Sequence, residues 1–473
     1  MNKIKAPPRI VVGAPWGYSG KTVISCAITK ILKEKGIKIQ TFKKGPDYID
    51  PSWLKAASGR PCRNLDLFLM GKEETVRRFF FHSAGCDFVL IEGNMGLYDG
   101  IEEDGSGSTA HISRILKAPV IIVVNTQKMT RTVAALVEGL KSFEPDTMIS
   151  GVILNNVSGE RHARKLLSAI EKYSRISVLG IIPRDKNLLI DSRHLGLVPF
   201  EEKLKNYSIL EKIANFTEKH LDIEAILEIG RKAQEFWLQL DEQKSPVDIK
   251  TVRIGVFYDH VFNFYYPENL EALESYGAEL VFINSVRDSR LPEIDGLYIG
   301  GGFPELYLEE LSSNRGLMQD VFFFVQEGNP LYAECGGLMY LCDHIHFGGR
   351  KYRMSGLIPA EVFLTKRPQA HGYVEAEVVG QNPYYPLGTV VRGHEFHHSA
   401  LKLTNRVDFI FKMRRGKGGY GLNDGILYKN MLASYTHIHS QGVSSWAENF
   451  VNLCLTLKGR RKSNYIIREV THG

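Results

Sequence analysis

The chain has 473 residues, of which 44% are hydrophobic and 24% charged, which is ordinary for globular protein and too long for a single small core. Its 59 basic and 53 acidic residues give a net charge of +6, so the surface is mixed and does not favour nucleic-acid binding. The six cysteines form no C-x-x-C pair, which argues against a zinc site or a disulfide framework. We therefore expect a cytoplasmic protein of at least two domains.

No segment of the sequence predicts export or membrane insertion. Residues 1–8 lack the apolar region and the small-residue cleavage site of a secretory signal. The most apolar run, residues 118–124, is far shorter than the roughly 20 residues that cross a bilayer. We interpret this run as a buried strand and expect no membrane partner.

Short β-branched runs alternate with helix-length amphipathic stretches in the first half of the chain. The strands that this pattern predicts are residues 9–13, 37–42, 87–92, 120–125, 149–155 and 178–182. Strands that alternate with helices are typical of a parallel α/β domain.

A second series of the same kind begins after a polar stretch that contains a proline, residues 241–248, which has the composition of an exposed linker. Its predicted strands are residues 252–257, 279–283, 296–300 and 330–333. We therefore predict two α/β domains, residues 1–246 and 247–473. The short basic stretch at residues 458–462 is interpreted as a solvated end.

The first predicted strand leads into A-P-W-G-Y-S-G-K-T at residues 14–22 and then into a helix at residues 23–33. In this context the loop's backbone N–H groups can surround phosphate oxygens, the lysine supplies positive charge, and the threonine can reach Mg²⁺. The residues expected to bind the nucleotide are Gly17, Ser19, Gly20, Lys21 and Thr22. Pro15 departs from the usual first glycine of such a loop, and the alternative is a turn that only caps a helix.

Carboxylates that could hold Mg²⁺ with Thr22 follow two other predicted strands, since Mg²⁺ prefers oxygen ligands. Asp47 lies in K-K-G-P-D-Y-I-D-P at residues 43–51, and Glu92 ends a strand before G-N-M-G-L-Y-D-G. The alternative for each acid is ordinary turn chemistry, and for Asp50 neither interpretation is favoured. The sequence thus predicts a P-loop parallel sheet domain with Asp47 and Glu92 beside the phosphates.

In the second domain, Cys335 lies in P-L-Y-A-E-C-G-G-L, between a predicted buried strand and an apolar helix. Such a turn exposes a thiol, and the following N–H groups lower its pKa and face a developing oxyanion. Gly301 and Gly302, in a second strand-to-glycine turn, could complete the oxyanion site. His437 is the candidate base. The alternative for Cys335 is a buried structural thiol.

A histidine cluster, His394, His397 and His398, precedes the candidate base in the sequence. Three imidazoles so close together could bind a metal ion. A hydrogen-bonded polar cluster near a substrate cleft is the interpretation that we favour.

Together these motifs resemble the cobyrinic acid a,c-diamide synthase family, whose N-terminal half is similar to dethiobiotin synthetase and whose C-terminal half is similar to triad-type class I glutamine amidotransferases. The resemblance covers nearly the whole chain. It rests on residues 19–22, 44–51, 59–66, 92–100, 193–197, 264–269, 393–397 and 433–437.

The resemblance implies that a carboxylate of a polycarboxylate tetrapyrrole attacks ATP to form an acyl phosphate, which ammonia from L-glutamine converts to an amide. It implies MgATP binding by Lys21, Thr22, Asp47 and Glu92. Tyr48 and Asp99 match family positions associated with the substrate or the phosphorylated intermediate. Cys335 would carry the glutamyl thioester and His437 would activate it. A homodimer is a candidate assembly that the sequence does not decide.

Departures from the family pattern leave alternatives open. His439 stands where full triads have glutamate, so the third member is absent or replaced. Lys44 and Asn94 differ from the commoner family motifs and are closer to those of a branch proposed to amidate siroheme. Siroheme and nickel sirohydrochlorin are therefore alternatives to cobyrinate. A nucleotide-switch protein would share the phosphate loop, yet it has no reason to carry Cys335 and His437. A degraded glutaminase fed by free ammonium is a third alternative.

Overall fold

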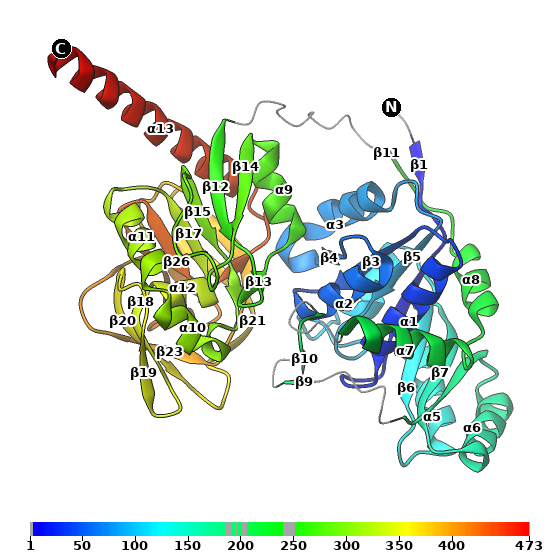
Figure 1. The fold of residues 1–473 in the computed structure, drawn as a ribbon. Coiled ribbons are helices and arrows are strands. Elements are labelled where there is room, and N and C mark those ends of the chain that lie inside the picture. The colour runs from blue at the N-terminus through cyan, green and yellow to red at the C-terminus, as the bar shows by residue number, and fades with distance from the viewer. Residues whose placement is uncertain (1–2, 186–191, 194–195, 201–205, 240–250, 473) are drawn as a thin grey trace. The chain divides into compact units, whose positions relative to one another are not determined.

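The computed structural model describes residues 3–185, 192–193, 196–200, 206–239 and 251–472 (Figure 1). The chain divides into two compact units: unit 1 comprises Met1–Leu67 and Gly71–Glu242, and unit 2 comprises Phe68–Met70 and Gln243–Gly473. The predicted boundary near residue 247 lies outside the described residues, as do His194 and Leu195 of one family motif. Among the helices described, none has the length and apolar character needed to span a membrane.

Unit 1 is built on a seven-stranded sheet with the order β4-β3-β5-β2-β6-β7-β8, in which every pairing is parallel. The strands are β2 (Arg9–Gly13), β3 (Ile39–Lys44), β4 (Arg63–Leu65), β5 (Phe88–Glu92), β6 (Val120–Asn125), β7 (Ile149–Val157) and β8 (Val178–Pro183). The strands predicted in this half are confirmed, with ends shifted by two residues at most, and β4 is an addition. Two short antiparallel pairs join β1 (Lys3–Lys5) to β11 (Trp237–Gln239) and β9 (Ser192–Arg193) to β10 (Gly196–Leu197).

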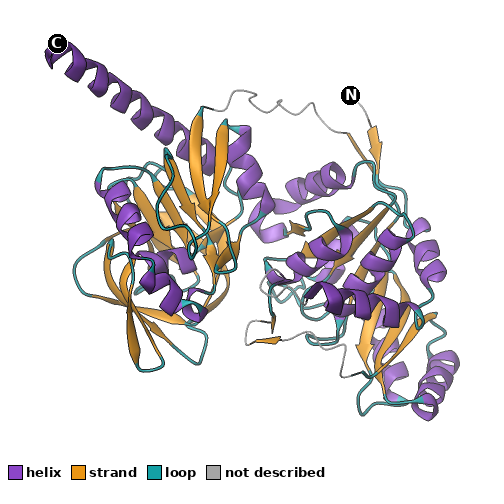
Figure 2. Ribbon diagram, viewed as in Figure 1, coloured by secondary structure: helices purple, strands orange, loops and turns teal. Residues whose placement is uncertain are grey.

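Helices cover both faces of this sheet (Figure 2). They are α1 (Lys21–Glu34), α2 (Ile49–Ser58), α3 (Leu67–Ser83), α4 (Thr109–Ile115), α5 (Thr132–Phe143), α6 (Glu160–Tyr173), α7 (Asn206–Glu218) and α8 (Ile223–Arg231). Along β2, Ile10 and Val12 enter one buried cluster and Val11 enters the other, because alternate side chains of a strand point to opposite faces. The sheet is thus buried on both sides, and polar residues are concentrated where its strands end.

Unit 2 is built on a ten-stranded sheet with the order β14-β12-β15-β17-β26-β25-β24-β21-β22-β27. The first five strands pair in parallel, and the remaining pairings are antiparallel. The strands of this sheet are β12 (Val252–Phe257), β14 (Ala278–Ile283), β15 (Gly296–Ile299), β17 (Leu331–Glu334), β21 (Ala370–Val378), β22 (Val390–His397), β24 (Asp408–Arg415), β25 (Asn423–Tyr428), β26 (Met431–Ser434) and β27 (His437–Ile438). The predicted α/β class is confirmed, and the antiparallel half extends beyond the prediction.

Smaller elements complete unit 2. A four-stranded sheet contains β18 (Cys342–Phe347), β19 (Arg350–Arg353), β20 (Ile358–Leu364) and β23 (Ser399–Leu403), and β13 (Phe262–Phe264) pairs with β16 (Gly301–Gly302). The helices are α9 (Pro267–Ser275), the 3₁₀ turn η3 (Pro304–Leu306), α10 (Leu308–Ser313), α11 (Arg315–Gln326), α12 (Gly336–Leu341) and α13 (Ser445–His472). The basic residues 458–462 lie within α13, whose Trp446 and Phe450 are buried in the core. None of the six cysteines, all of which are among the described residues, forms a disulfide bond.

Candidate active sites

The phosphate loop connects β2 to α1 in a conformation that requires glycine at residue 20. Gly20 has φ 94°, and a Cβ there would lie 2.3 Å from Nδ2 of Asn155. The same Asn155 amide donates a hydrogen bond of 3.0 Å to the Ser19 carbonyl, and the Ser19 hydroxyl donates to the carbonyl of Trp16 at 2.9 Å. Asn155 lies in β7, two residues before its end, and was missed because an asparagine in a strand carries little signal. A Cβ on Gly17 would contact nothing within 4 Å, so no contact inside the protein requires that glycine.

Lys21, the first residue of α1, is buried at the mouth of the loop. Its Nζ donates to the Met95 carbonyl at 2.8 Å and lies 3.4 Å from that of Trp16. Burial, reinforced by the positive charge of Lys43, lowers the pKa of Lys21 to about 8, although nearby carboxylates oppose the change. The ammonium is thus held by neutral carbonyls, which leaves its charge available to an incoming anion.

Lys43 lies at the centre of the acidic cluster, and its side chain is 1% exposed. Its Nζ is 2.5 Å from Oδ2 of Asp50, 2.8 Å from Oε1 of Glu92 and 3.6 Å from Oδ2 of Asp47. The structure therefore brings Asp47 and Glu92 together as expected and adds Asp50. Lys43 was overlooked because a lysine in a buried strand has no distinctive spacing, although an all-buried strand that contains one predicts a buried counter-charge.

Glu92 is fully buried at the end of β5 and joins this cluster to the phosphate loop. Its Oε1 accepts a hydrogen bond of 2.9 Å from the Thr22 hydroxyl, whereas its buried Oε2 has no hydrogen-bond partner. Burial raises the pKa of Glu92 against the opposing charge of Lys43. A carboxylate oxygen that accepts no hydrogen bond and a neighbouring hydroxyl oxygen are the kind of ligands that a hard divalent cation prefers.

The pKa values of the two aspartates of the cluster are shifted in opposite directions. Burial and the neighbouring Asp50 charge raise the pKa of Asp47 to about 7. Burial acts in the same sense on Asp50, but the charge of Lys43 and its hydrogen bond outweigh it and lower the pKa of Asp50. For Lys43 itself, burial is outweighed by Asp50 and Glu92, which raise its pKa well above the ordinary value. Lys43 is therefore held as a cation by its contacts with Asp50 and Glu92.

The residues expected to meet the substrate lie around the same cluster. Tyr48 is half-buried and forms the N-cap of α2, directly after Asp47. Asp99 follows β5, and its Oδ2 accepts the Gly96 N–H at 2.9 Å. A Cβ on Gly96 would lie 2.4 Å from that same oxygen, so Asp99 closes the loop tightly.

Cys335 occupies a sharp turn between β17 and α12. Its φ of 46° and ψ of −101° are strained for a residue other than glycine. The backbone N–H donates to the Ser434 carbonyl at 2.7 Å, which fixes the turn against β26. Only 6% of the residue is exposed. Strain of this kind is typical of a turn that presents a nucleophile.

His437 lies in β27, three residues after β26 ends, and β26 pairs in parallel with the strand that leads to Cys335. Its Nδ1 is 3.2 Å from Oε2 of Glu334, and the two side chains are 3% and 1% exposed. Burial alone would lower the pKa of His437, but hydrogen bonding to Cys335 and Glu334 and the charges of both raise it to about 10. The sequence predicted the Cys335–His437 pair but not the role of Glu334 as its neighbour.

The second glycine turn closes on this pair. A Cβ on Gly301 would lie 2.5 Å from Cε1 and 3.3 Å from Nε2 of His437. At Gly302 a Cβ would lie 1.8 Å from the Val261 carbonyl oxygen. A Cβ on Gly336, which follows the cysteine, would approach the Gly302 nitrogen to 3.2 Å. The turn at Cys335–Gly336 and the turn at Gly301–Gly302 therefore approach each other closely enough that a side chain on any of these glycines would clash.

The histidine cluster does not form a metal centre. Among the residues described, no group of three or more His, Cys, Asp or Glu side chains is arranged to hold a metal ion. His397 Nδ1 donates to the Ser399 carbonyl at 2.8 Å, and burial lowers its pKa to about 4. His394 stacks on His437 with ring centroids 4.9 Å apart, and burial holds its pKa well below the ordinary value. Both rings are neutral packing partners at ordinary pH.

The chain is similar in sequence to known proteins over nearly its whole length. Residues 10–198 match the model of the CobQ/CobB/MinD/ParA nucleotide binding domain, and residues 253–444 match that of the CobB/CobQ-like glutamine amidotransferase domain. A cobyrinate a,c-diamide synthase of Archaeoglobus fulgidus is 42% identical over 95% of this chain and 98% of its own length. The chain belongs to the cobyrinate a,c-diamide synthase family. Synthases of the same name from Magnetococcus marinus, 42% identical over 93% of this chain and 96% of theirs, and from Methanobrevibacter smithii, 40% identical over 93% and 98%, are further relatives.

Membership of this family confirms the reaction class predicted from the sequence. The chain is a nucleotide-binding, glutamine-hydrolysing ligase, and a nucleotide-switch protein is not favoured. The phosphate loop and Glu92 fall inside the nucleotide-binding match, and Cys335 and His437 fall inside the glutamine amidotransferase match.

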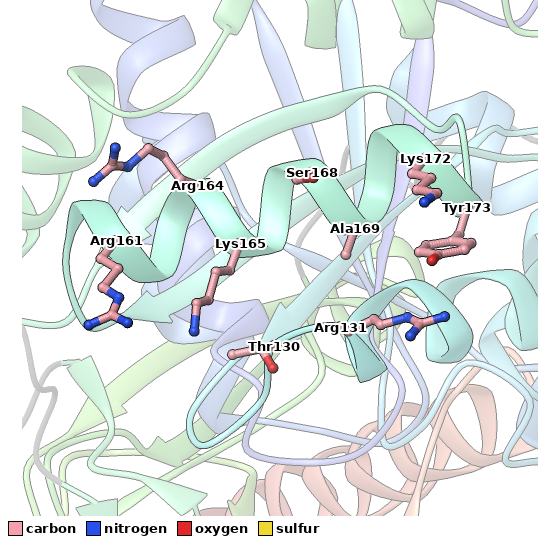
Figure 3. A pocket seen from close by; sticks show the side chains of 9 residues that line it. All are labelled: Thr130, Arg131, Arg161, Arg164, Lys165, Ser168, Ala169, Lys172 and Tyr173. Carbon is pink, nitrogen blue, oxygen red and sulfur yellow. The ribbon is translucent and has the colours of Figure 1, made fainter.

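A surface hollow of unit 1 is lined by none of the candidate site residues described above. It runs along α6 beside the start of α5 and is lined by Arg131, Arg161, Arg164, Lys165, Lys172 and their uncharged neighbours (Figure 3). No residue that the sequence analysis assigned to catalysis, nucleotide, metal or substrate lines it. The candidate sites are therefore defined by buried polar contacts and not by this hollow.

Proposed function

We propose that this protein catalyses the ATP- and glutamine-dependent amidation of the a- and c-carboxylates of cobyrinate, a step of cobalamin biosynthesis. The observation that carries the proposal is that one chain holds both a phosphate loop joined to buried carboxylates and a strained cysteine beside a histidine. In this proposal residues 1–246 form the amide ligase domain and residues 247–473 form the glutaminase domain. The names of the relatives support cobyrinate over siroheme or nickel sirohydrochlorin.

The ligase half activates the substrate as an acyl phosphate. A substrate carboxylate oxygen attacks the γ-phosphorus of ATP, the bond to the β–γ bridging oxygen breaks, and ADP leaves. The loop N–H groups of Gly17 to Thr22 surround the phosphates, and Lys21 places its ammonium against the charge that develops on the transferred group. Tyr48 and Asp99 orient the substrate carboxylate or the acyl phosphate beside this loop.

Thr22, Asp47 and Glu92 are the residues that would hold Mg²⁺. The unpartnered Oε2 of Glu92 and the adjacent Thr22 hydroxyl fit a hard cation. When bound, the ion supplies positive charge that neutralises the phosphate oxygens. Lys43 supports the same cluster by neutralising Asp50 and Glu92 before the nucleotide arrives.

The glutaminase half supplies ammonia. The Cys335 thiolate attacks the side-chain amide carbon of glutamine, and the N–H groups beside Gly301 and Gly302 stabilise the oxyanion. As the C–N bond breaks, His437 gives its proton to the departing nitrogen, and ammonia leaves a γ-glutamyl thioester. Water then hydrolyses the thioester to glutamate, and ammonia displaces phosphate from the acyl phosphate to form the amide.

The proposal is tested by incubating the full chain with ATP, Mg²⁺ and glutamine and with one macrocycle at a time. The macrocycles are cobyrinate, siroheme, sirohydrochlorin and nickel sirohydrochlorin, and mass spectrometry counts the amidated carboxylates. We expect two amidations of cobyrinate with one ADP formed per amide. Amidation of siroheme or nickel sirohydrochlorin in preference to cobyrinate would overturn the substrate, and ATP hydrolysis without amidation of any macrocycle would overturn the ligase.

A further inference from the structure

The catalytic histidine of unit 2 has a carboxylate neighbour at an unexpected place in the sequence. The residue two positions after it, His439, does not serve, because His439 Nε2 faces Oε2 of Glu268 at 3.7 Å and its ring packs on Tyr266. Glu334, which directly precedes the nucleophile, instead lies 3.2 Å from Nδ1 of His437. The carboxylate therefore reaches the histidine from the strand that carries the cysteine.

We propose that Glu334 is the positioning residue of His437 and completes a Cys335–His437–Glu334 triad in which the carboxylate and the nucleophile are consecutive residues. This inference rests on the proposed glutaminase function of Cys335 and His437. It needs neither the identity of the macrocycle nor the ligase half of the reaction.

The contact determines which nitrogen of His437 can exchange a proton with Cys335. A carboxylate only accepts hydrogen bonds, so Nδ1 carries the proton and donates it to Glu334. Nε2 is then left for Cys335 and faces the Gly301 turn, where a Cβ would lie 3.3 Å from it. A histidine held in this tautomer can take the thiol proton at Nε2 and give it to the departing amide nitrogen, which then leaves as ammonia.

Glu334 is itself fixed by its surroundings. It is the last residue of β17, where it pairs with Ser434 of β26, and its Oε1 lies 3.4 Å from the Ile438 N–H. One carboxylate thus holds both the ring of His437 and the backbone that follows it. Because both side chains are almost fully buried, solvent screening of the pair is weak.

The other titratable groups around the pair do not compete for this role. Among the described residues, the titratable groups that interact with His437 or Glu334 are Cys335, His394, His397, Tyr265, Tyr298, Tyr332 and Tyr385. Burial keeps the pKa values of the two histidines low, and burial with the Glu334 charge keeps those of the tyrosines high. These histidines and tyrosines carry no negative charge at pH 7, so Glu334 is the carboxylate that balances an imidazolium here.

The test replaces Glu334 by Gln, which keeps the shape and removes the charge, and by Asp, which keeps the charge. The matched control is Glu268→Gln, which alters the neighbour of His439. Glutamate release and amide formation with glutamine are measured from pH 6 to 10.5, and amide formation with ammonium salts is measured in parallel. Labelling of Cys335 by a glutamine-like electrophile reports whether the pocket is folded.

We expect Glu334→Gln to lower the kcat of glutaminase by about 10²–10⁴-fold with little change in KM, because the wrong tautomer is populated. The glutaminase pH–rate profile of the native protein should lose activity near pH 10, where His437 loses its proton. In Glu334→Gln this loss should occur at lower pH, since removal of the carboxylate lowers the histidine pKa. Glu334→Asp should recover part of the rate, Glu268→Gln should stay within about threefold, and ammonium-fed activity should be unchanged.

A Glu334→Gln protein that labels normally, keeps kcat within about threefold and keeps the alkaline limb in place would overturn the triad. A Glu268→Gln protein that loses as much activity as Glu334→Gln would overturn it as well, because the effect would then be general to buried carboxylates. A different result would overturn the proposed glutaminase function itself, namely a Cys335→Ala protein that retains glutaminase activity.

Discussion

The two candidate sites of this protein control reactive charge by opposite means. In unit 1 the site is a cluster of ionised side chains, in which Lys43 is in contact with Asp50 and Glu92 and lies near Asp47. In unit 2 few side chains are charged, and the site is shaped by backbone: the strained turn at Cys335 and the glycine turn at Gly301–Gly302. The first site must receive a highly charged nucleotide, and the second a neutral amide.

This difference predicts which kind of substitution damages each site. Removal of a charge should disable the phosphate site, because the remaining buried charges lose their partner. Addition of a single methyl group should disable the glutaminase site, because its turns meet at backbone distance. Substitution of the glutaminase nucleophile should separate the activities of the two halves most completely.

Cys335→Ala is expected to have the largest effect. Without the thiol no thioester forms, so glutamine-dependent amidation should fall by at least about 10⁴-fold, whereas amidation fed by ammonium salts should persist. The measurement is amide formation with each nitrogen source. Cys342→Ala is the control, because Cys342 is buried in the same unit and its thiol donates to the Leu338 carbonyl at 3.3 Å. Equal activity of Cys335→Ala and the native chain with glutamine would support the degraded glutaminase.

Lys43→Met is expected to have the next largest effect. It leaves Asp50 and Glu92 buried without their counter-ion, which should lower the free energy of unfolding of unit 1 by about 3–5 kcal/mol. ATP consumption should fall by about 10²–10³-fold, as for loss of a preorganised charge. The instability should grow as pH rises, because the unpaired carboxylates are then increasingly ionised.

Denaturant unfolding between pH 5 and 8 and ADP release measure these two effects. Lys30→Met is the control, because Lys30 forms a partly exposed i,i+4 pair with Glu34 on α1, and its loss should change stability by less than about 1 kcal/mol. If Lys43→Met were as stable as Lys30→Met at every pH, the interpretation of Lys43 as a buried counter-ion would be wrong.

The sequence predicted the parts of each site that depend on local order. The phosphate loop and Asp47 each follow a predicted strand and Glu92 ends one, and the carboxyl ends of parallel strands meet at one edge of a sheet. Cys335 was predicted for the same reason, from a strand, a turn and a helix. These features need only the chain direction and the alternation of elements.

The features that escaped prediction depend on contacts between distant strands. Lys43 and Asp50 are seven residues apart, but their importance comes from Glu92 on a neighbouring strand. Glu334 lies one residue beyond the predicted strand 330–333 and was given no role. The pairing of β17 with β26 is what brings His437 within 3.2 Å of it. The antiparallel half of the unit 2 sheet was missed because strands there, such as β21, alternate buried with partly exposed residues and lack the apolar runs of parallel strands.

Gly301→Ala should produce an intermediate effect that is specific to unit 2. The added Cβ would lie 2.5 Å from Cε1 of His437, so the ring must move, and a displacement of this order lowers a rate by about 10–10²-fold. Glutamate release should fall by that factor, and ammonium-fed amidation should not change. Gly459→Ala is the control, because a Cβ there contacts nothing within 4 Å. Native glutaminase activity in Gly301→Ala would show that the backbone turn tolerates side chains and would remove the contrast between the two sites.

The smallest expected effect is a pH dependence of nucleotide binding, which tests whether unit 1 is governed by charge alone. Burial lowers the pKa of Lys21 to about 8, so the ammonium that attracts phosphate is lost as pH rises through that value. Without Mg²⁺, the affinity for ADP should therefore fall above pH 8, by up to about tenfold per pH unit. Calorimetry from pH 7 to 9.5 measures it. Lys21→Arg keeps its charge over this range while Asp47 titrates in both proteins, so the difference between the two curves isolates Lys21. If the curves were parallel, the backbone N–H groups and not the lysine charge would dominate phosphate binding, and the two sites would be more alike than their side chains suggest.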